Sequence, residues 1–275
     1  MSLISSILLG LVQGIAEFLP ISSSGHLAIA EKLLGESTSI PDFFDVLLHL
    51  GTLAAVFAAY WPDIRAMIFE FFQGASDLIH KKTPVPVPPA RRMILLIIVA
   101  TLPLGLILPV KDTIEAMSDN LYFVSVALLL TGCLLFVSDR VKPGKKTAKN
   151  ATLRDALLVG FAQAVATCPG ISRSGTTITA GCFVGFDRKF AVRYSFLMSI
   201  PAILGANILS LKDAIATVVV AEIPMYLVGV LVSAVVGYAC IRLLKMIADK
   251  GKFGFFAYYC WAAGLLTLIL TIIQN

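Results

Sequence analysis

Two polar stretches, residues 13–26 and 163–176, interrupt apolar segments of this chain and match each other in sequence. At a single offset of 150 residues (163 minus 13), Gln13 matches Gln163 and Ser22 matches Ser172. The further matching pairs are Gly10 and Gly160, Ala16 and Ala166, Ile21 and Ile171, Ser24 and Ser174, and Gly25 and Gly175. A motif that recurs at one offset indicates an internal repeat. The chain is therefore expected to fold as two related halves.

The composition is that of a membrane protein with many spans. Of the 275 residues, 58% are hydrophobic and 14% are charged, and the mean hydropathy is +0.89; a soluble domain has about 25% charged residues. The net charge of +5 arises from short loops without a basic stripe, so no nucleic-acid partner is expected. The five cysteines lack paired spacing and predict neither disulfides nor a metal site. Six segments are long enough to cross a bilayer: 44–61, 93–110, 121–138, 194–211, 223–241 and 253–273.

Two further apolar regions, 1–34 and 153–186, are broken in the middle by proline and glycine. The breaks are Pro20-Ile-Ser-Ser-Ser-Gly25 and Cys168-Pro-Gly-Ile-Ser-Arg-Ser-Gly175. Such breaks leave backbone groups unpaired and are tolerated at membrane depth only where protein or a wet cavity surrounds them. Both regions are therefore predicted to be re-entrant helix–loop–helix hairpins. The expected fold class is an all-α polytopic membrane protein of six transmembrane helices and two such hairpins.

Positive charge sets the expected orientation in the membrane. Eighteen of the 22 Lys and Arg residues lie in the loops 62–92, 140–154, 187–193 and 242–252. These loops are predicted to be cytoplasmic. The first hairpin and both termini then lie on the outer side, and the second hairpin enters from the cytoplasm.

Each half, about 1–140 and 151–275, contains one hairpin and three spans, and an odd number of spans inverts the second copy. The two broken loops would then approach each other from opposite faces near the middle of the membrane, where inverted repeats usually form a substrate site. The segments 83–89 and 142–150 are expected to be linkers. The prediction is thus a single integral-membrane domain over 1–275.

The two loops carry groups that suit phosphoryl transfer. Gln13 and Glu17 are four residues apart and share one helix face, where they could hold a divalent cation or activate a nucleophile. Arg173 lies among hydroxyls at the expected start of a helix, an arrangement that binds phosphate well. The polar residues around these three are Ser22, Ser23, Ser24 and His26 in the first loop and Ser172, Ser174, Thr176 and Thr177 in the second.

Simpler interpretations are open for several residues. Serine and glycine in membrane helices often serve close packing, and Arg173 could be a structural ion-pair partner of Glu17. His49, far from either loop in sequence, is interpreted as a hydrogen-bonded structural residue, and Asp45 as a solvated or capping residue. The aromatic residues Tyr258, Tyr259 and Trp261 fit an interfacial belt. The functional interpretation is favoured because the repeat brings the two polar loops face to face.

At these residues the sequence resembles the bacitracin-resistance type of undecaprenyl-pyrophosphate phosphatase. That family has a Glu/Gln-x-x-x-Glu element running into Ser-Ser-x-Gly-His, and a second loop Pro-Gly-x-Ser-Arg-Ser-Gly-x-Thr. The corresponding stretches here are Gln13–Glu17, Ser22-Ser-Ser-Gly-His26 and Pro169-Gly-Ile-Ser-Arg-Ser-Gly-Thr-Thr177. The similarity extends over essentially the whole chain, including its length and span pattern.

The resemblance implies a hydrolase of the cytoplasmic membrane that removes the terminal phosphate from undecaprenyl pyrophosphate. The product would be the monophosphate carrier lipid used for cell-wall (peptidoglycan) precursors. The site would face the periplasm or cell exterior, and Mg²⁺ or Ca²⁺ would assist. Gln13 stands where many members have glutamate, and an amide binds a hard cation less tightly than a carboxylate. The expected metal ligands are Glu17 and, more weakly, Gln13.

Roles can be expected for each group in such a site. Arg173 would clamp the phosphates and stabilise the charge of the transition state. Glu17 would accept a proton from the nucleophile or hold the cation. Ser23 is the favoured nucleophile, and His26 would protonate the leaving group or itself be phosphorylated. The further phosphate-binding residues would be Ser22, Ser24, Ser172, Ser174 and Thr177.

A transporter is the alternative from another class of protein. Inverted repeats, broken helices and a midplane anion site also occur in secondary carriers, which would move a lipid phosphate or a small anion without hydrolysis. Binding alone does not require Glu17 and His26 together, and this favours the enzyme. The expected partners are undecaprenyl pyrophosphate and membrane lipid, and the sequence leaves a homodimer open.

Overall fold

The computed structural model describes residues 1–34, 42–82, 84–142, 144–250 and 253–274. In these ranges the regular elements are helices, and one isolated β-bridge pairs Lys146 with Phe186. The α-helices are α1 (Leu3–Phe18), α2 (Ser23–Leu34), α3 (Asp42–Ala59), α4 (Trp61–Ile79), α5 (Pro89–Thr101), α6 (Lys111–Ala116), α7 (Leu121–Ser138), α8 (Leu153–Val165), α9 (Arg173–Phe183), α10 (Arg188–Ala216), α11 (Ile223–Lys250) and α12 (Gly254–Gln274). Short 3₁₀ helices are η1 (Leu102–Leu106), η2 (Leu108–Val110), η3 (Met117–Asp119) and η4 (Val220–Glu222).

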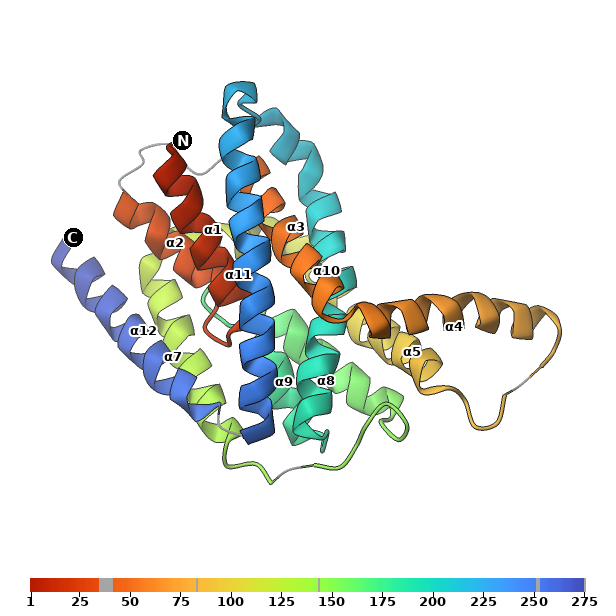
Figure 1. The fold of residues 1–275 in the computed structure, drawn as a ribbon. Helices are drawn as coiled ribbons and strands as arrows, with labels where there is room; N and C mark the ends of the chain where they lie inside the picture. Colours follow the sequence, from red (N-terminus) through yellow and green to blue (C-terminus); the bar gives the residue numbers. More distant parts are fainter. Residues whose placement is uncertain (35–41, 83, 143, 251–252, 275) are drawn as a thin grey trace.

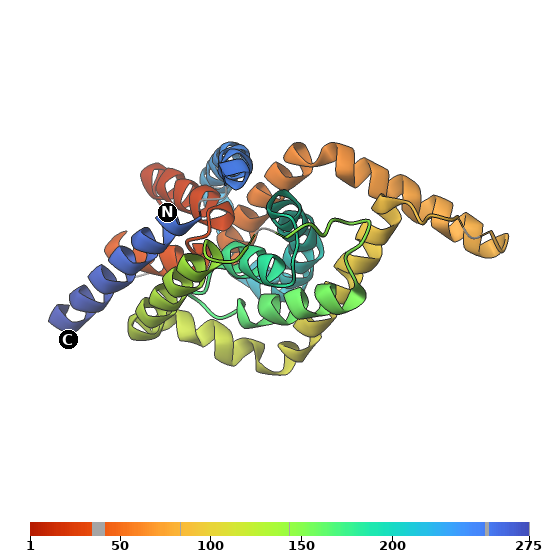
Figure 2. The ribbon, with the colours of Figure 1, turned by 90° about the horizontal axis from the view of Figure 1, so that it is seen from below.

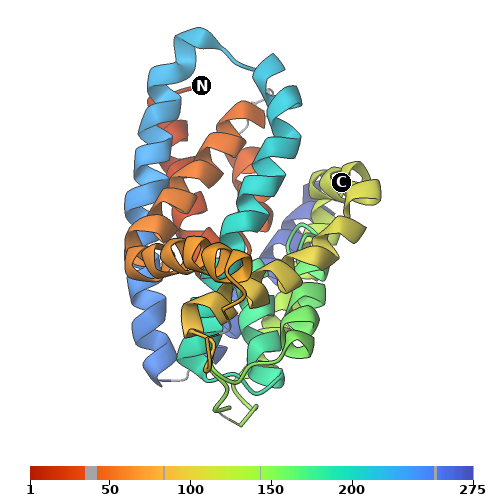
Figure 3. The same cartoon turned by 90° about the vertical axis from the view of Figure 1, so that its right-hand side faces the viewer.

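The helices long and apolar enough to cross a membrane agree with five of the predicted spans. They are Pro89–Asp119, Leu121–Ser138, Arg188–Lys212, Val220–Ala248 and Gly254–Ile273. Each contains or nearly coincides with one predicted segment. Figure 3 shows two of the long helices, α10 and α11, running most of the height of the molecule. An all-helical architecture with several spans is therefore confirmed.

The sixth predicted span, 44–61, differs from the structure. It corresponds to α3, which qualifies as a span only together with α4, and the two are bent by 84°. The bend falls at Tyr60, just before Pro62 in the first turn of α4, where the missing N–H of proline needs no partner. Beyond it, α4 leaves the bundle sideways (Figure 1), with Phe69 and Phe72 exposed.

Both regions predicted as hairpins contain a helix, a loop and a second helix. α1 and α2 flank residues 19–22, and α8 and α9 flank residues 166–172. The breaks differ from the predicted ones, because α2 and α9 already begin at Ser23 and Arg173. In Figure 1, α1 and α2 lie in the upper part of the molecule and α8 and α9 in the lower part. Figure 2 shows α8 and α9 near the centre, where they pack against α5, α7 and α10.

The matching glycines Gly10 and Gly160 lie at equivalent helix contacts. A Cβ at Gly10 would lie 2.6 Å from the carbonyl oxygen of Gly229 on α11, and a Cβ at Gly160 would lie 2.4 Å from that of Ala100 on α5. Either side chain would force the helices apart. Such small residues let membrane helices pack backbone to backbone. Each helix–loop–helix unit is thus held against one long apolar helix of the other half.

Buried aromatic rings fix the end of α1. Phe18 packs edge-to-face on Phe196 of α10, with 5.5 Å between ring centroids, and Phe196 also contacts Tyr60 at 5.9 Å. All three side chains are almost fully buried. Aromatic pairs in this geometry add about 0.5–1.5 kcal/mol beyond the area they bury. The residue directly before Phe18, Glu17, is thereby held in a defined place.

Candidate active site

The two loops lie against each other near the centre of the molecule (Figure 1). The backbone N–H of Gly170 donates to Ser24 Oγ at 3.4 Å, and Ser174 Oγ donates to the carbonyl oxygen of Leu19 at 3.4 Å. The approach is close, since a Cβ added at Gly25 would lie 3.0 Å from the Cα of Gly170. The two loops therefore contact each other, as predicted.

Glu17 is the group on which the predicted residues converge. Its carboxylate forms an ion pair with Arg173 and accepts a hydrogen bond from Ser23 Oγ at 2.6 Å. Gln13 Nε2, one turn earlier on α1, donates to the same carboxylate oxygen at 3.3 Å. The Glu17 side chain is only 5% exposed, so these partners replace the water that its charge would otherwise need. A carboxylate this close to a serine hydroxyl can take its proton as the oxygen attacks.

The helix starts that present Ser23 and Arg173 use the same local hydrogen bonds. Ser22 Oγ accepts from the backbone N–H three residues later at 3.3 Å, and Ser172 Oγ does the same at 3.1 Å. Ser22 has a φ of +74°, a left-handed conformation that costs roughly 1–2 kcal/mol. Thr131 of α7 accepts from the N–H of Ser172 at 3.1 Å and holds the second loop. Ser23 and Arg173 are thus the first residues of capped helices.

The hydroxyls of the second loop are engaged with the protein itself. Ser172 Oγ and Ser174 Oγ are 3.3 Å apart, and both residues are almost fully buried. Thr177 Oγ1 donates to the carbonyl oxygen of Arg173 at 2.8 Å and lies 2.6 Å from Ser195 Oγ on α10. These contacts fix the first turn of α9 and, with it, the guanidinium. The predicted part of these hydroxyls in binding phosphate stays a prediction.

His26 lies beside the first loop and contacts α12. Its Nδ1 is 2.8 Å from the carbonyl oxygen of Ser22, and its Nε2 is 2.8 Å from the hydroxyl of Tyr259. Because a carbonyl only accepts, Nδ1 carries the proton, and in the neutral ring Nε2 accepts from Tyr259. Tyr259, expected in an interfacial belt, therefore orients His26. In the described part of the chain, His26 makes no hydrogen bond or ion pair to Glu17.

His49 was not expected in this site. Its Nε2 lies 4.0 Å from Glu17 Oε2, and its Nδ1 is 3.0 Å from the carbonyl oxygen of Asp45 and 3.6 Å from Asp45 Oδ2. His49 thus makes a structural hydrogen bond, as interpreted, but α3 also brings it beside the Glu17 carboxylate. Asp45 and His49 are one helical turn apart, and this spacing was the sequence signal that could have indicated a functional position for His49. Asp45 itself is half-exposed, as expected for a solvated residue.

The donor chemistry of Gln13 and Glu17 suits a hard cation. Gln13 Oε1 is buried and has no hydrogen-bond partner among the residues described, and Glu17 brings a carboxylate. Amide and carboxylate oxygens are ligands that Mg²⁺ and Ca²⁺ prefer. The described residues contain no group of three or more His, Cys, Asp or Glu that could hold a metal ion. A cation here would take its remaining ligands from water and from phosphate oxygens.

Known proteins share this chain's sequence over almost its whole length. Residues 6–266 match the family described as bacitracin resistance protein BacA. An undecaprenyl-diphosphatase from Methanosphaera stadtmanae is 42% identical over 99% of both chains. Proteins of the same name from Alkaliphilus metalliredigens and Treponema denticola are 40% and 42% identical, over 99% and 96% of this chain and 100% and 96% of their own.

Proposed function

The chain belongs to the BacA family of bacitracin resistance proteins, and we propose that it is an undecaprenyl-diphosphatase. It is a multi-pass membrane hydrolase that converts undecaprenyl pyrophosphate and water to undecaprenyl phosphate and inorganic phosphate. This reaction returns the lipid carrier to peptidoglycan synthesis and opposes bacitracin. The names of the relatives support the reaction. The observation that carries the proposal is the buried Glu17 between the Ser23 hydroxyl and the Arg173 guanidinium.

The chemical step begins with an exchange of partners at Arg173. The pyrophosphate competes with Glu17 for the guanidinium, which then binds the phosphate oxygens and stabilises their charge in the transition state. Glu17, released from the ion pair, accepts the proton of Ser23. A bond forms between Ser23 Oγ and the terminal phosphorus, and the bridging P–O bond breaks, so that undecaprenyl phosphate leaves. Water then cleaves the phosphoserine and releases phosphate.

The contacts support Ser23 over His26 as the nucleophile. Ser23 Oγ is 2.6 Å from a carboxylate that can take its proton. His26 has Nδ1 on a backbone carbonyl, and its Nε2 lone pair accepts from the Tyr259 hydroxyl, so the nitrogen that would attack phosphorus is already occupied. In its imidazolium form, His26 is instead assigned to proton donation from Nε2 to the leaving oxygen. Its hydrogen bond to Ser22 fixes the orientation of the ring for that step.

Gln13 and Glu17 are assigned as the protein ligands of a divalent cation, Mg²⁺ or Ca²⁺. When bound, the ion supplies positive charge that neutralises the pyrophosphate. The free Gln13 Oε1 supports this assignment, because a buried acceptor without a partner is costly unless it has one in the working state. Gln13 also positions Glu17 through its amide N–H.

The architecture is assigned as an inverted repeat with two re-entrant hairpins. The site is assigned to open towards the outer side of the membrane. Two features support the repeat. The contacts of Gly10 with α11 and of Gly160 with α5 are equivalent between the halves. The two loops also repeat the same capping hydrogen bonds at Ser22 and Ser172. The concentration of Lys and Arg in four loops supports the direction of the opening.

Phosphate release by the purified protein in detergent tests the function. With undecaprenyl pyrophosphate as substrate, we expect turnover by the wild type and a loss of about 10³-fold in Arg173→Ala, because the phosphates lose their clamp. Arg154→Ala, which removes an exposed guanidinium from α8, is the matched control and should stay active. EDTA tests the cation separately. A well-folded wild type that releases no phosphate would contradict the enzyme and favour a carrier.

A further inference from the structure

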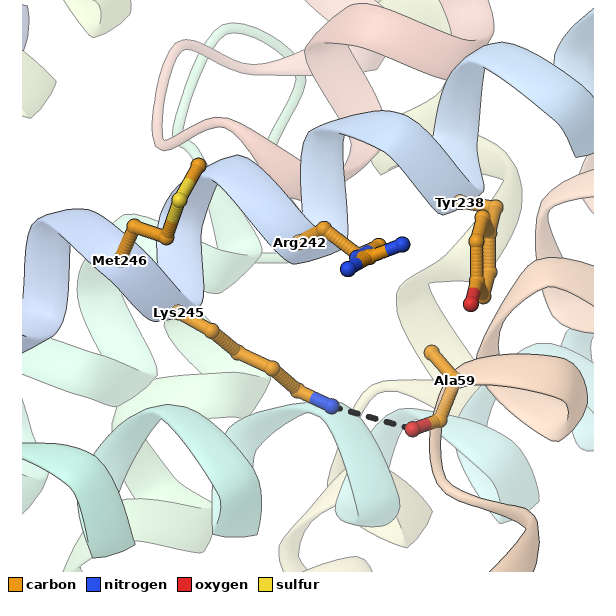
Figure 4. A pocket seen from close by; sticks show the side chains of 5 residues that line it. All are labelled: Ala59, Tyr238, Arg242, Lys245 and Met246. Carbon is orange, nitrogen blue, oxygen red and sulfur yellow. Dashed lines mark hydrogen bonds between the residues drawn. The ribbon is translucent and has the colours of Figure 1, made fainter.

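A second charged site lies on α11, at the corner where α3 meets α4. A hollow of about 420 Å³ is lined by Ala59, Tyr238, Arg242, Lys245 and Met246 (Figure 4). Two of these side chains are cationic, and none is acidic. On α11, Arg242 follows Tyr238 by four residues, and Lys245 and Met246 follow Arg242 by three and four, so all four share one face of the helix. We propose that this hollow binds the phosphate headgroup of an anionic phospholipid.

Lys245 is held in place without being neutralised. Its Nζ donates to the carbonyl oxygen of Ala59 at 3.0 Å and lies 3.6 Å from the centroid of the Tyr60 ring. The carbonyl is the last of α3 and uses one of the three N–H donors of the ammonium. Neither the carbonyl nor the ring carries a full negative charge. The ammonium is therefore fixed at the edge of the hollow with donors to spare.

Arg242 is exposed, and in the described part of the chain its guanidinium has no ion pair or hydrogen bond. Figure 4 shows this guanidinium on the same side of α11 as Tyr238, whose hydroxyl points towards Ala59. A guanidinium and a phenol hydroxyl are both donors that bind phosphate oxygens. The open side of the hollow is therefore a surface of hydrogen-bond donors.

Neighbouring charge strengthens the attraction for an anion. Asp63 is the carboxylate that attracts the Lys245 ammonium electrostatically, but it already forms an ion pair with Arg193. Arg193, Arg242 and Lys245 against Asp63 leave an excess of two positive charges. The Lys245 ammonium and the Arg242 guanidinium, which line the same hollow, repel each other. A bound phosphate would relieve that repulsion.

The position of the hollow in the membrane favours a lipid over a free anion. The α11 segment that carries these cations lies within a candidate span, Val220–Ala248, and Leu243 and Met246 next to them are exposed apolar side chains. A lipid can place its headgroup on the cations and its acyl chains along this apolar surface. Basic pockets between transmembrane helices are known to bind anionic headgroups. A free phosphate ion would leave the apolar surface unused, so the lipid is the proposed occupant.

The test measures lipid stabilisation of the full-length protein in neutral detergent. We expect phosphatidylglycerol to raise the melting temperature of the wild type and phosphatidylcholine to raise it less. In Arg242→Gln the half-maximal phosphatidylglycerol concentration should be about five-fold higher, since one basic residue near an anionic surface contributes about 1 kcal/mol. Arg154→Gln removes the same charge from an exposed position on α8 and should behave as the wild type. Arg242→Lys keeps the charge and should restore lipid binding.

Three results of the melting experiment would overturn the proposal. The first is the same phosphatidylglycerol dependence in Arg242→Gln and Arg154→Gln. The second is equal stabilisation by phosphatidylcholine, and the third is displacement of the lipid by millimolar inorganic phosphate, which would indicate a site for a free anion. Native mass spectrometry of the wild type is independent of any variant. It should show one retained anionic lipid per chain, and complete absence of such a lipid would also contradict the site.

Discussion

The loop 19–22 and the loop 166–172 share the capping hydrogen bonds of Ser22 and Ser172 but not their chemistry. At equivalent positions, Glu17 is replaced by Thr167 and Ser23 by Arg173. Thr167 donates its hydroxyl to the carbonyl oxygen of Ala164 at 2.7 Å, within its own turn. The first copy thus keeps the proton acceptor and the hydroxyl, and the second supplies the cation. In the proposed mechanism, the groups of one reaction are thus divided between two stretches of matching sequence.

The matching glutamines Gln13 and Gln163 differ in their hydrogen bonds. Gln13 and Gln163 are both fully buried. Gln13 donates to Glu17, whereas neither amide atom of Gln163 has a hydrogen-bond partner in the described part of the chain. With Thr167 in place of a glutamate, the second copy lacks the carboxylate that the first provides. A buried amide without partners costs about 1–3 kcal/mol.

The largest effect is expected where a residue is present in one copy only. Ser23→Ala should lower kcat by about 10⁴-fold, because the attacking oxygen is removed. Ser24→Ala, which changes a serine that both copies retain, should cost no more than about ten-fold. Phosphate release in detergent measures both. A greater loss in His26→Ala than in Ser23→Ala would instead identify the imidazole as the nucleophile.

Replacement of the carboxylate should have the next largest effect. Glu17→Gln keeps the shape of the side chain but cannot accept the Ser23 proton, and kcat should fall by about 10³-fold. Thr167→Val is the equivalent change in the second loop and should leave kcat near the wild-type value. Equal losses of kcat in Glu17→Gln and Thr167→Val would show that the two loops do not have different roles in the reaction. A melting curve for each variant separates activity from folding.

A smaller effect is expected for His49, which lies outside both loops. His49→Gln should reduce kcat by at least about five-fold, because a charged imidazole 4.0 Å from the Glu17 carboxylate interacts with it by about 1 kcal/mol even in bulk water. His80→Gln changes an exposed histidine at the end of α4 and should have no effect. Unchanged kinetics in His49→Gln would confine the reaction to the two loops.

The smallest effect concerns stability alone. Gln163→Met removes a buried amide without partners at nearly the same volume, and stability should rise by up to about 1 kcal/mol. Activity should not change. Gln13→Met, in contrast, should lower activity because Glu17 loses a hydrogen bond. Thermal unfolding in detergent measures the first effect, and a clear loss of stability in Gln163→Met would mean that the amide binds buried water.

The parts of the fold that depend on composition could be predicted from the sequence. Apolar length identifies the long helices, and proline with glycine identifies where the two breaks lie, although α2 and α9 begin before the predicted breaks end. The convergence of Glu17, Ser23 and Arg173 was accessible because the repeat itself predicts that the loops meet. These inferences depend on which residues are apolar and on their order, and both can be read directly.

The parts that depend on how helices rotate and bend could not be predicted. His49 contacts Glu17 only because α3 turns that face towards α1, and periodicity does not fix this rotation. Tyr259 reaches His26 from 233 residues away, and an aromatic residue near a helix start is equally typical of an interfacial belt. The 84° bend after α3 depends on Tyr60 and Pro62, which a continuous apolar pattern conceals.

The ion pair between Glu17 and Arg173 joins residues 156 positions apart, and this separation has a consequence for biosynthesis. A nascent chain exposes its carboxylate and serine long before the ribosome has translated the arginine. The first half therefore enters the bilayer as a catalytically silent fragment. Competence arises only when the second half has been inserted and docked, so hydrolysis of the carrier lipid reports on the completed assembly of the whole chain.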